Sequence, residues 1–196
     1  IQSTILDGTN GQIAVQLIMW SGSAQQEVML DWTLLDSNLA LNDFSSAILE
    51  IARPFSGWTA PGSAIDYSYQ TFASNEYQGL KQIIDVSGDG VINSGISADI
   101  AGGQALNAGI DTINGIVITS DQAVIDYYQS DVIKGDGAFL MVAENYDAFS
   151  EAIAQKILGE LSGETPEDAI VVAISEPSAM TLLGLAFFML IIRKRV

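Results

Sequence analysis

The stretch Ile83-Ile84-Asp85-Val86-Ser87-Gly88-Asp89-Gly90 combines a short β-branched run with an acidic, glycine-rich segment. The run is typical of a buried strand, and the Gly-Asp-Gly that follows it indicates the loop that ends the strand. Such a strand delivers Asp and Ser side chains to one edge of a sheet. Because carboxylate and hydroxyl oxygens suit Mg²⁺ and Ca²⁺, the sequence predicts a ligand site at that edge.

Strand-like and helix-like segments alternate on both sides of this stretch. Apolar or β-branched runs predict further strands over residues 13–20, 28–34, 113–118 and 138–142. Apolar periodicity predicts helices over residues 44–51 (capped by Asn42 or Asp43), 63–72, 97–108, 121–130 and 146–161. In the helix over 97–108, Ile100, Ala101, Ala105 and Leu106 are expected to face inward. This alternation predicts an α/β fold with a doubly wound, mostly parallel sheet and helices on both faces.

Charge and composition exclude several classes of function. Three of the seven basic residues are Arg193, Lys194 and Arg195, so residues 1–192 carry 24 acidic and 7 − 3 = 4 basic side chains, a net charge of −20. Such a body repels nucleic acid phosphates, and no nucleic-acid partner is expected. The chain contains no Cys and no His. That composition excludes thiol nucleophiles, Ser–His triads and zinc sites built on those residues, and no enzymatic activity is expected.

Several short segments, taken in order, resemble the von Willebrand factor type A (VWA) superfamily. Thr59-Ala60-Pro61-Gly62-Ser63-Ala64-Ile65 resembles its Thr-x-x-Gly-x-Ala-Leu segment, and residues 83–90 resemble the strand that ends in an Asp-Gly pair. The resemblance extends over about residues 1–162, and an uncharacterised bacterial branch is the closest match. Its other hallmarks are Ile13-Ala14-Val15 to Trp20-Ser21, Asp31-Trp32-Thr33, Asn114-Gly115, Tyr127-Tyr128 and Gly135-Asp136-Gly137-Ala138-Phe139.

The resemblance implies a divalent cation, Mg²⁺ or Ca²⁺, bound above the sheet, with one coordination position left for an acidic group of a partner. Thr59 matches the superfamily's loop Thr ligand and Asp89 its loop Asp ligand, with Asp85 and Ser87 as weaker metal-ligand candidates. The Asp-x-Ser-x-Ser segment that supplies the other ligands does not occur in this sequence. We expect that segment, and the first, central strand that carries it, to lie upstream of Ile1.

A calcium loop is the alternative interpretation of residues 85–96. Asp85, Ser87 and Asp89 occupy positions 1, 3 and 5 of an EF-hand or dockerin loop, and Gly90 occupies position 6. Position 12 should be acidic but is Ile96, and a helix is expected before the loop. Under this alternative the protein is an anchored calcium-loop or structural matrix protein without a metal-mediated partner site.

The C-terminal region is distinct from the rest of the chain. We expect a VWA-like domain over 1–161, a linker over 162–175 and a segment over 176–196 that resembles a PEP-CTERM sorting signal. Residues 179–192 carry no charge, and Arg193-Lys194-Arg195 follows them, which predicts a short transmembrane helix with its basic end in the cytoplasm.

Glu176-Pro177, the apolar run and the basic end resemble the PEP-CTERM tail, although Ser175 replaces its first Pro. The resemblance implies export, processing by an exosortase at Glu176 and Pro177, and delivery to the envelope or extracellular matrix. The implied function is binding of a protein or matrix partner.

Overall fold

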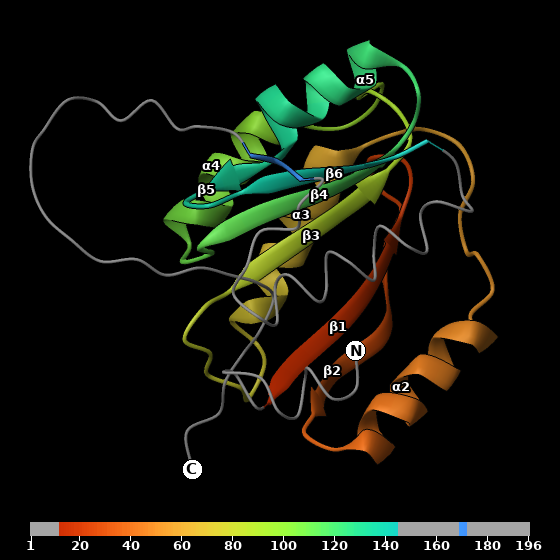
Figure 1. The fold of residues 1–196 in the computed structure, drawn as a ribbon, viewed down its shortest axis with the longest axis vertical. Helices are drawn as coiled ribbons and strands as arrows, with labels where there is room; N and C mark the ends of the chain where they lie inside the picture. The colour runs from red at the N-terminus through yellow and green to blue at the C-terminus, as the bar shows by residue number, and fades with distance from the viewer. Residues whose placement is uncertain (1–11, 145–168, 172–196) are drawn as a thin grey trace, which may run out of the picture.

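The structure, a computed structural model, describes residues 12–144 and 169–171. It is a mixed α/β fold in which strands and helices alternate along most of the described chain (Figure 1). The predicted helix over 146–161, most of the linker, Glu176, Pro177 and the predicted membrane helix lie outside the described residues. Within those residues, no helix is both long enough and apolar enough to cross a membrane.

The strands within the described residues form two separate sheets. In the first sheet, β1 (Ile13–Trp20) pairs antiparallel with β2 (Gln26–Leu35). In the second, β3 (Ile83–Gly88), β4 (Thr112–Ile118) and β6 (Phe139–Ala143) lie side by side and parallel. The two-residue strands β5 (Lys134–Gly135) and β7 (Ile170–Val171) pair antiparallel with β4 and β6, respectively. The single sheet expected from the alternating pattern is therefore divided between β1 and β3 in the described part of the chain.

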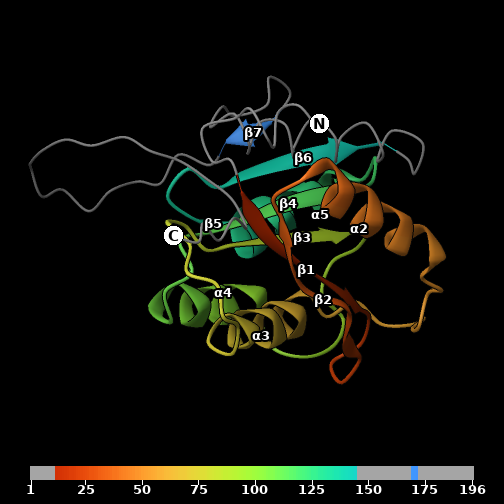
Figure 2. The same cartoon turned by 90° about the horizontal axis from the view of Figure 1, so that it is seen from below.

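Three helical segments cover one face of the second sheet. Figure 2 shows α3 (Pro61–Phe72) and α4 (Ala98–Asn107) together on the same side of the strands. α5 (Gln122–Tyr127) continues into a π-helical turn over Tyr128–Val132 and contributes to the same core. The core of this face consists of Ile65, Ile84, Val86, Ala98, Ala101, Ala105, Ile110, Ile113, Val117, Val124, Tyr128, Val132, Ile133, Ala138 and Leu140. The core on the opposite face joins both sheets and includes Leu41 of α2 (Asn38–Glu50).

Most strand and helix predictions are confirmed, with four corrections. The helix predicted to start after Asn42 or Asp43 begins instead at Asn38, because Ser37 caps it by accepting a hydrogen bond from the Ala40 amide at 3.2 Å. Ile100 was expected to face inward but is 57% exposed. The buried face of α4 consists of small residues, Ala98, Ala101, Gly102 and Ala105, which lets the helix lie close to its neighbours.

The other two corrections concern strand ends. Gly88 was assigned to the loop, but Gly88, like Ser87 before it, still pairs with β4, opposite Val117 and Ile116 respectively. Strand pairing therefore continues until the Gly88–Asp89 step, and Asp89 is the first residue beyond the strand. Ile170–Val171 fall inside the predicted linker but add a short antiparallel strand to β6, opposite Leu140 and Phe139.

Candidate functional site

Three connections meet at the edge where β1 and β3 end. They are the β1–β2 turn, the loop between α2 and α3, and the loop between β3 and α4. The first two connections are joined at Ser21, whose carbonyl accepts from the Ala60 amide at 3.0 Å. The Ser21 hydroxyl also donates to the Trp58 carbonyl at 2.9 Å. Ser21 therefore fixes the backbone on both sides of Thr59.

The third connection is joined to the second through Asn93. The Asn93 side chain accepts from the Thr59 amide at 2.7 Å, and the Asn93 amide donates to the Thr59 carbonyl at 3.0 Å. Both backbone groups of Thr59 are thus hydrogen-bonded to one residue of the β3–α4 loop. Within the described residues the Thr59 hydroxyl itself forms no hydrogen bond, so its oxygen is available to a ligand.

The Thr59 hydroxyl lies beside the loop residue that follows Asp89. A Cβ built on Gly90 would be 3.4 Å from Thr59 Oγ1. Thr59 is half-buried, whereas Asp89 is exposed. The two residues for which the sequence predicted a shared site, 30 positions apart in the chain (89 − 59 = 30), are therefore brought to neighbouring places on one edge.

Two glycines let the loops approach closely. Gly95 has a φ of 80°, and a Cβ there would overlap the Ser63 hydroxyl and lie 3.2 Å from Ser23 Cβ. A Cβ on Gly62 would overlap the backbone of Ile96. The β3–α4 loop thus lies directly against the first turn of α3 and the β1–β2 turn, and any larger side chain at either glycine would force them apart.

The weaker candidates Asp85 and Ser87 lie within strand β3 and not in the loop that contains Asp89. Asp85 is exposed in the middle of β3, opposite Asn114 of β4. Because a strand rises about 3.3 Å per residue, Asp85 lies about 10 Å or more from Asp89 along the strand direction. An EF-hand would need a helix before Asp85, and the structure has strand β3 there, so the EF-hand geometry is not found. Asp85 and Asp89 cannot bind one ion in the way that loop requires.

An aromatic cluster lies beneath the end of β3. A Cβ on Gly88 would overlap the Tyr128 hydroxyl and would lie 3.3 Å from the Trp20 ring. Tyr128 is completely buried, and its hydroxyl has no hydrogen-bond partner among the described residues. Burial raises the pKa of Tyr128 above its ordinary value, and Tyr127 and Asp89 raise it further. Burial, with Asp131, also raises the pKa of Tyr127 to about 12.

The described residues supply only part of a cation site. Asp89 offers a carboxylate and Thr59 a hydroxyl, both of which are suitable ligands for Mg²⁺ or Ca²⁺. These cations take six or more oxygen ligands, and no group of three acidic side chains is found in the described residues. The site therefore fits a cation only if other segments complete its shell.

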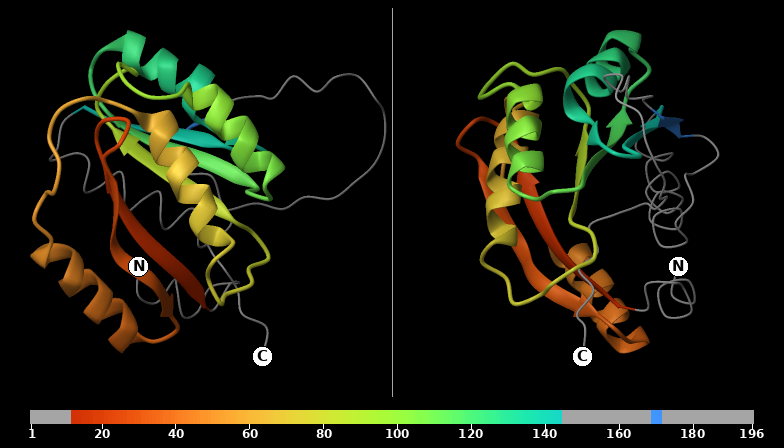
Figure 3. Two further views of the ribbon diagram at one scale, coloured as in Figure 1. Left: turned by 180° about the vertical axis from the view of Figure 1, so that it is seen from behind. Right: turned by 90° about the vertical axis from the view of Figure 1, so that its left-hand side faces the viewer.

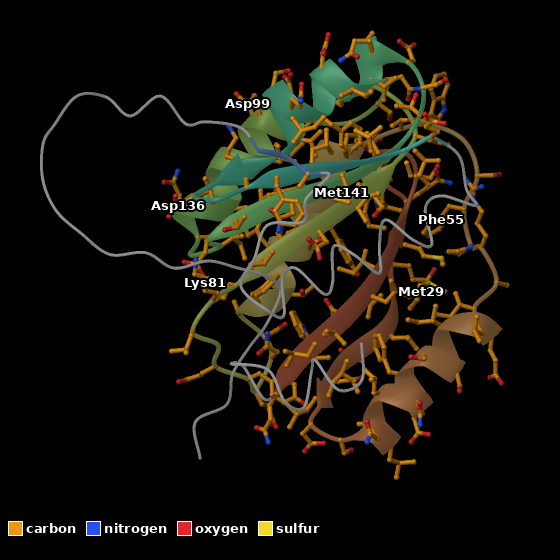
Figure 4. All side chains as sticks on the ribbon, in the orientation of Figure 1. Met29, Phe55, Lys81, Asp99, Asp136 and Met141 are labelled. Atoms are coloured by element: carbon orange, nitrogen blue, oxygen red, sulfur yellow. The ribbon has the colours of Figure 1, made fainter. Side chains whose placement is uncertain are left out.

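The charged residues Lys81 and Asp136 lie away from this site. Figure 4 shows both at the opposite end of the strands from Phe55, which lies in the loop leading to Thr59.

Exposed apolar side chains flank the two candidate ligands. Trp58, directly before Thr59, is 65% exposed, and Val91, two positions after Asp89, is 44% exposed. Exposed aromatic residues beside a polar centre are typical of surfaces that contact other proteins. The edge thus combines oxygen ligands with apolar contact area.

Sequence reasoning missed Ser21 and Asn93, which hold Thr59 in place. It identified Gly88 and Gly90 only as loop glycines, whereas in the structure they give room to Tyr128 and Thr59. The sequence held one signal, since Ser and Asn next to turn glycines often bond to backbone groups. The partners of those bonds are far away in the chain and could not be inferred from it.

Comparison with known proteins assigns the chain to a family. No curated protein and no solved structure matches it. A family model described as "Protein of unknown function (DUF1194)" matches residues 1–165, which include every described strand and helix except β7. The chain belongs to the DUF1194 family.

Proposed function

We propose that this protein is an exported, envelope- or matrix-associated binding module of the VWA-like kind, with no enzymatic activity. Its recognition face is the edge formed by Thr59, Asp89 and the neighbouring loops. A divalent cation, Mg²⁺ or Ca²⁺, assists recognition of a protein or matrix partner at this face. The fold of this module is a doubly wound, mostly parallel sheet with helices on both faces.

The observation that carries the proposal is the position of the Thr59 hydroxyl beside Gly90. The backbone around Thr59 is fixed by Ser21 and Asn93, and the Thr59 hydroxyl is left without a hydrogen bond among the described residues. A hydroxyl held in this way beside an exposed carboxylate is preorganised as a ligand pair. Asp89 and Thr59 would hold the cation, and Trp58 and Val91 would contact the partner around it.

Export and processing are proposed from the sequence of the C-terminal region. The uncharged run 179–192 and its basic end supply a short anchor, and Glu176 and Pro177 are the proposed exosortase recognition residues. The strongly acidic body favours an extracellular or surface location over contact with nucleic acid or anionic lipid.

Calorimetry with Mg²⁺ and with Ca²⁺, on the polypeptide as its gene encodes it, tests the cation site. Asp89→Asn and Thr59→Val should each weaken cation binding about tenfold or more, because each removes an oxygen ligand. Asp136→Asn, at the opposite end of the strands, is the matched control and should leave the affinity unchanged. Ca²⁺-selective binding that is lost in Asp85→Asn and kept in Asp89→Asn would contradict the proposal and support a calcium loop.

Adhesion to extracellular matrix isolated from the producing cells tests the partner face. EDTA and Asp89→Asn should both abolish adhesion, whereas Asp136→Asn should not. Adhesion that persists in EDTA would show that the partner is recognised without a cation.

A further inference from the structure

The same tripeptide, Gly-Asp-Gly, occurs twice in the part of the chain that the structure describes. Gly88-Asp89-Gly90 ends strand β3, and Gly135-Asp136-Gly137 leads from β5 toward β6. Figure 1 shows the end of β3 and the β5–β6 connection at opposite ends of the sheet. Both aspartates are exposed. Because the local sequence is the same, a difference in chemistry between them has to come from the tertiary structure.

An Asp-Gly dipeptide can rearrange to isoaspartate with water as its only reactant. The glycine nitrogen bonds to the side-chain carboxyl carbon, and the carboxyl OH and the amide hydrogen leave as water, which gives a five-membered succinimide ring. Water then adds to the ring and breaks one of its two C–N bonds. When the bond to the original backbone carbonyl breaks, the main chain runs through Cβ and Cγ. Glycine favours ring closure because it has no Cβ to hinder its nitrogen.

The β5–β6 connection resists this ring closure. The Ala138 amide donates to the Gly135 carbonyl at 3.2 Å, which closes a turn around Asp136 and Gly137. The Thr112 hydroxyl donates to the Asp136 carbonyl at 3.1 Å, and Thr112 is buried. Strands β5 and β6 hold the two ends of the connection. Ring closure at Asp136 therefore has to break hydrogen bonds of the folded protein.

The β3–α4 loop lacks such restraints directly after Asp89. Within the described residues, positions 90–92 form no hydrogen bond. The next anchor is Asn93, whose amide donates to the Thr59 carbonyl at 3.0 Å. A Cβ on Gly90 would contact only the Thr59 side chain, at 3.4 and 3.9 Å. The Gly90 nitrogen can thus approach the Asp89 side chain without breaking a hydrogen bond of its own.

The far end of this loop is fixed, which confines the freedom to the residues next to Asp89. Figure 3 shows α4, into which the loop leads, beside α3. A Cβ on Gly62 of α3 would overlap the backbone of Ile96, directly before the α4 cap residue Ser97. The loop is therefore held at Asn93 and again at the start of α4.

We propose that Asp89 is a site of spontaneous isoaspartate formation in the folded protein, and that Asp136, in the same tripeptide, is protected. The rearrangement adds one carbon to the main chain between Asp89 and Gly90. The free carboxylate is then attached directly to Cα and leaves its present position. Loss of a cation ligand at Asp89 by this route rests on the proposed function, whereas the rearrangement itself needs no cation.

Incubation of the folded protein at neutral pH and physiological temperature tests the proposal, with EDTA present so that the result does not depend on a cation. Digestion with a protease that cleaves before Asp but not before isoaspartate, followed by fragmentation mass spectrometry, measures conversion at each position. Conversion should be about tenfold or more faster at Asp89 than at Asp136, because ring closure at Asp136 must first break two hydrogen bonds. In guanidinium chloride the two rates should become similar. Equal rates in the folded protein, faster conversion at Asp136 or no conversion at Asp89 would overturn the proposal.

Two variants test the structural cause at each position. Thr112→Val removes the hydroxyl that holds the Asp136 carbonyl, so it should raise the rate at Asp136 several-fold and leave the rate at Asp89 unchanged. An unchanged rate at Asp136 would overturn the proposed protection. Because Thr112 is buried and its variant can lose stability, Gly90→Ala provides an independent measurement at an exposed loop. Its methyl group hinders the attacking nitrogen and should lower the rate at Asp89 several-fold. A rate that Gly90→Ala does not lower would overturn the proposed reaction.

Discussion

Strands β3 and β4 are neighbours in one sheet, yet they use their polar residues in opposite ways. Asn114 of β4 is completely buried, and its side chain accepts from the Phe139 amide at 3.1 Å. Asp85 of β3 lies directly opposite Asn114 and is exposed. β4 is paired along both edges, whereas β3 is paired along one in the described chain. The comparison shows that a polar residue is part of the structural framework where its strand is paired along both edges and its side chain is buried.

The same comparison bears on the proposed recognition face. Asp89, the first residue beyond β3, is exposed, as Asp85 is. An exposed carboxylate at the end of the strand supports the cation-assisted face.

Removing the two opposed side chains should have the largest and most unequal effects. Asn114→Ala should lower the free energy of unfolding by about 2–4 kcal/mol, because it leaves a cavity and a buried Phe139 N–H without its acceptor. Asp85→Ala should lower it by less than Asn114→Ala does, because the Asp85 side chain is exposed and its removal leaves no buried cavity. Urea unfolding of both variants measures the difference. Equal losses would mean that Asp85 is as enclosed as Asn114 in solution.

Alanine at two glycines should distinguish the crowding around the end of β3 from that around β4. A Cβ on Gly115 would lie 2.8 Å from Leu140 and 3.1 Å from Ile133, whereas a Cβ on Gly88 would meet the Tyr128 hydroxyl. Each substitution should lower the free energy of unfolding by about 1–3 kcal/mol. Adding Tyr128→Phe should recover part of the loss at Gly88, because the overlapping oxygen is removed, and little of the loss at Gly115.

Gly103→Ala is the matched control for these variants. Gly103 lies in α4 with nothing within 4 Å of an added Cβ. Alanine there should raise the free energy of unfolding by about 0.5–1 kcal/mol through helix propensity alone. Urea midpoints of the Gly88→Ala, Gly115→Ala and Gly103→Ala variants, with and without Tyr128→Phe, provide the test. If Tyr128→Phe restored equal stability to the Gly88 and Gly115 variants, the contact between Gly88 and the Tyr128 hydroxyl would be contradicted.

The smallest effect is expected at alkaline pH, where the tyrosines beneath β3 titrate. The pKa of Tyr128 is raised and that of Tyr127 is about 12 in the folded protein, whereas an unfolded tyrosine has a pKa of about 10. The unfolded state therefore loses these protons first, so the contribution of the two tyrosines to stability is constant below about pH 10 and declines as pH rises above it. Tyr128→Phe should make the decline of the urea midpoint above pH 10 shallower than in the parent protein. An unchanged decline would show that Tyr128 is solvated.

Much of this molecule could be predicted from short segments of its sequence. The apolar runs over residues 13–20 and 113–118 predicted β1 and β4 closely. A buried strand can be recognised in the sequence because the apolar side chains that it buries follow one another in the chain. Gly-Asp-Gly after a strand is a local pattern that singled out Asp89, whereas Thr59 was singled out by the resemblance of residues 59–65 to a VWA segment. The start of α2 was misplaced because Ser37 was overlooked in favour of Asn42 and Asp43, and all three are suitable caps.

Only the tertiary structure decided which distant groups meet. That Ser21 and Asn93 fix Thr59, that Tyr128 lies beneath Gly88, and that Asn114 rather than Asp85 is buried all depend on residues far apart in sequence. The division of the strands between two sheets has the same origin, because local patterns specify a strand but not its neighbour. Pairing partners are selected by packing across the whole core, and one-dimensional patterns carry no information about that choice.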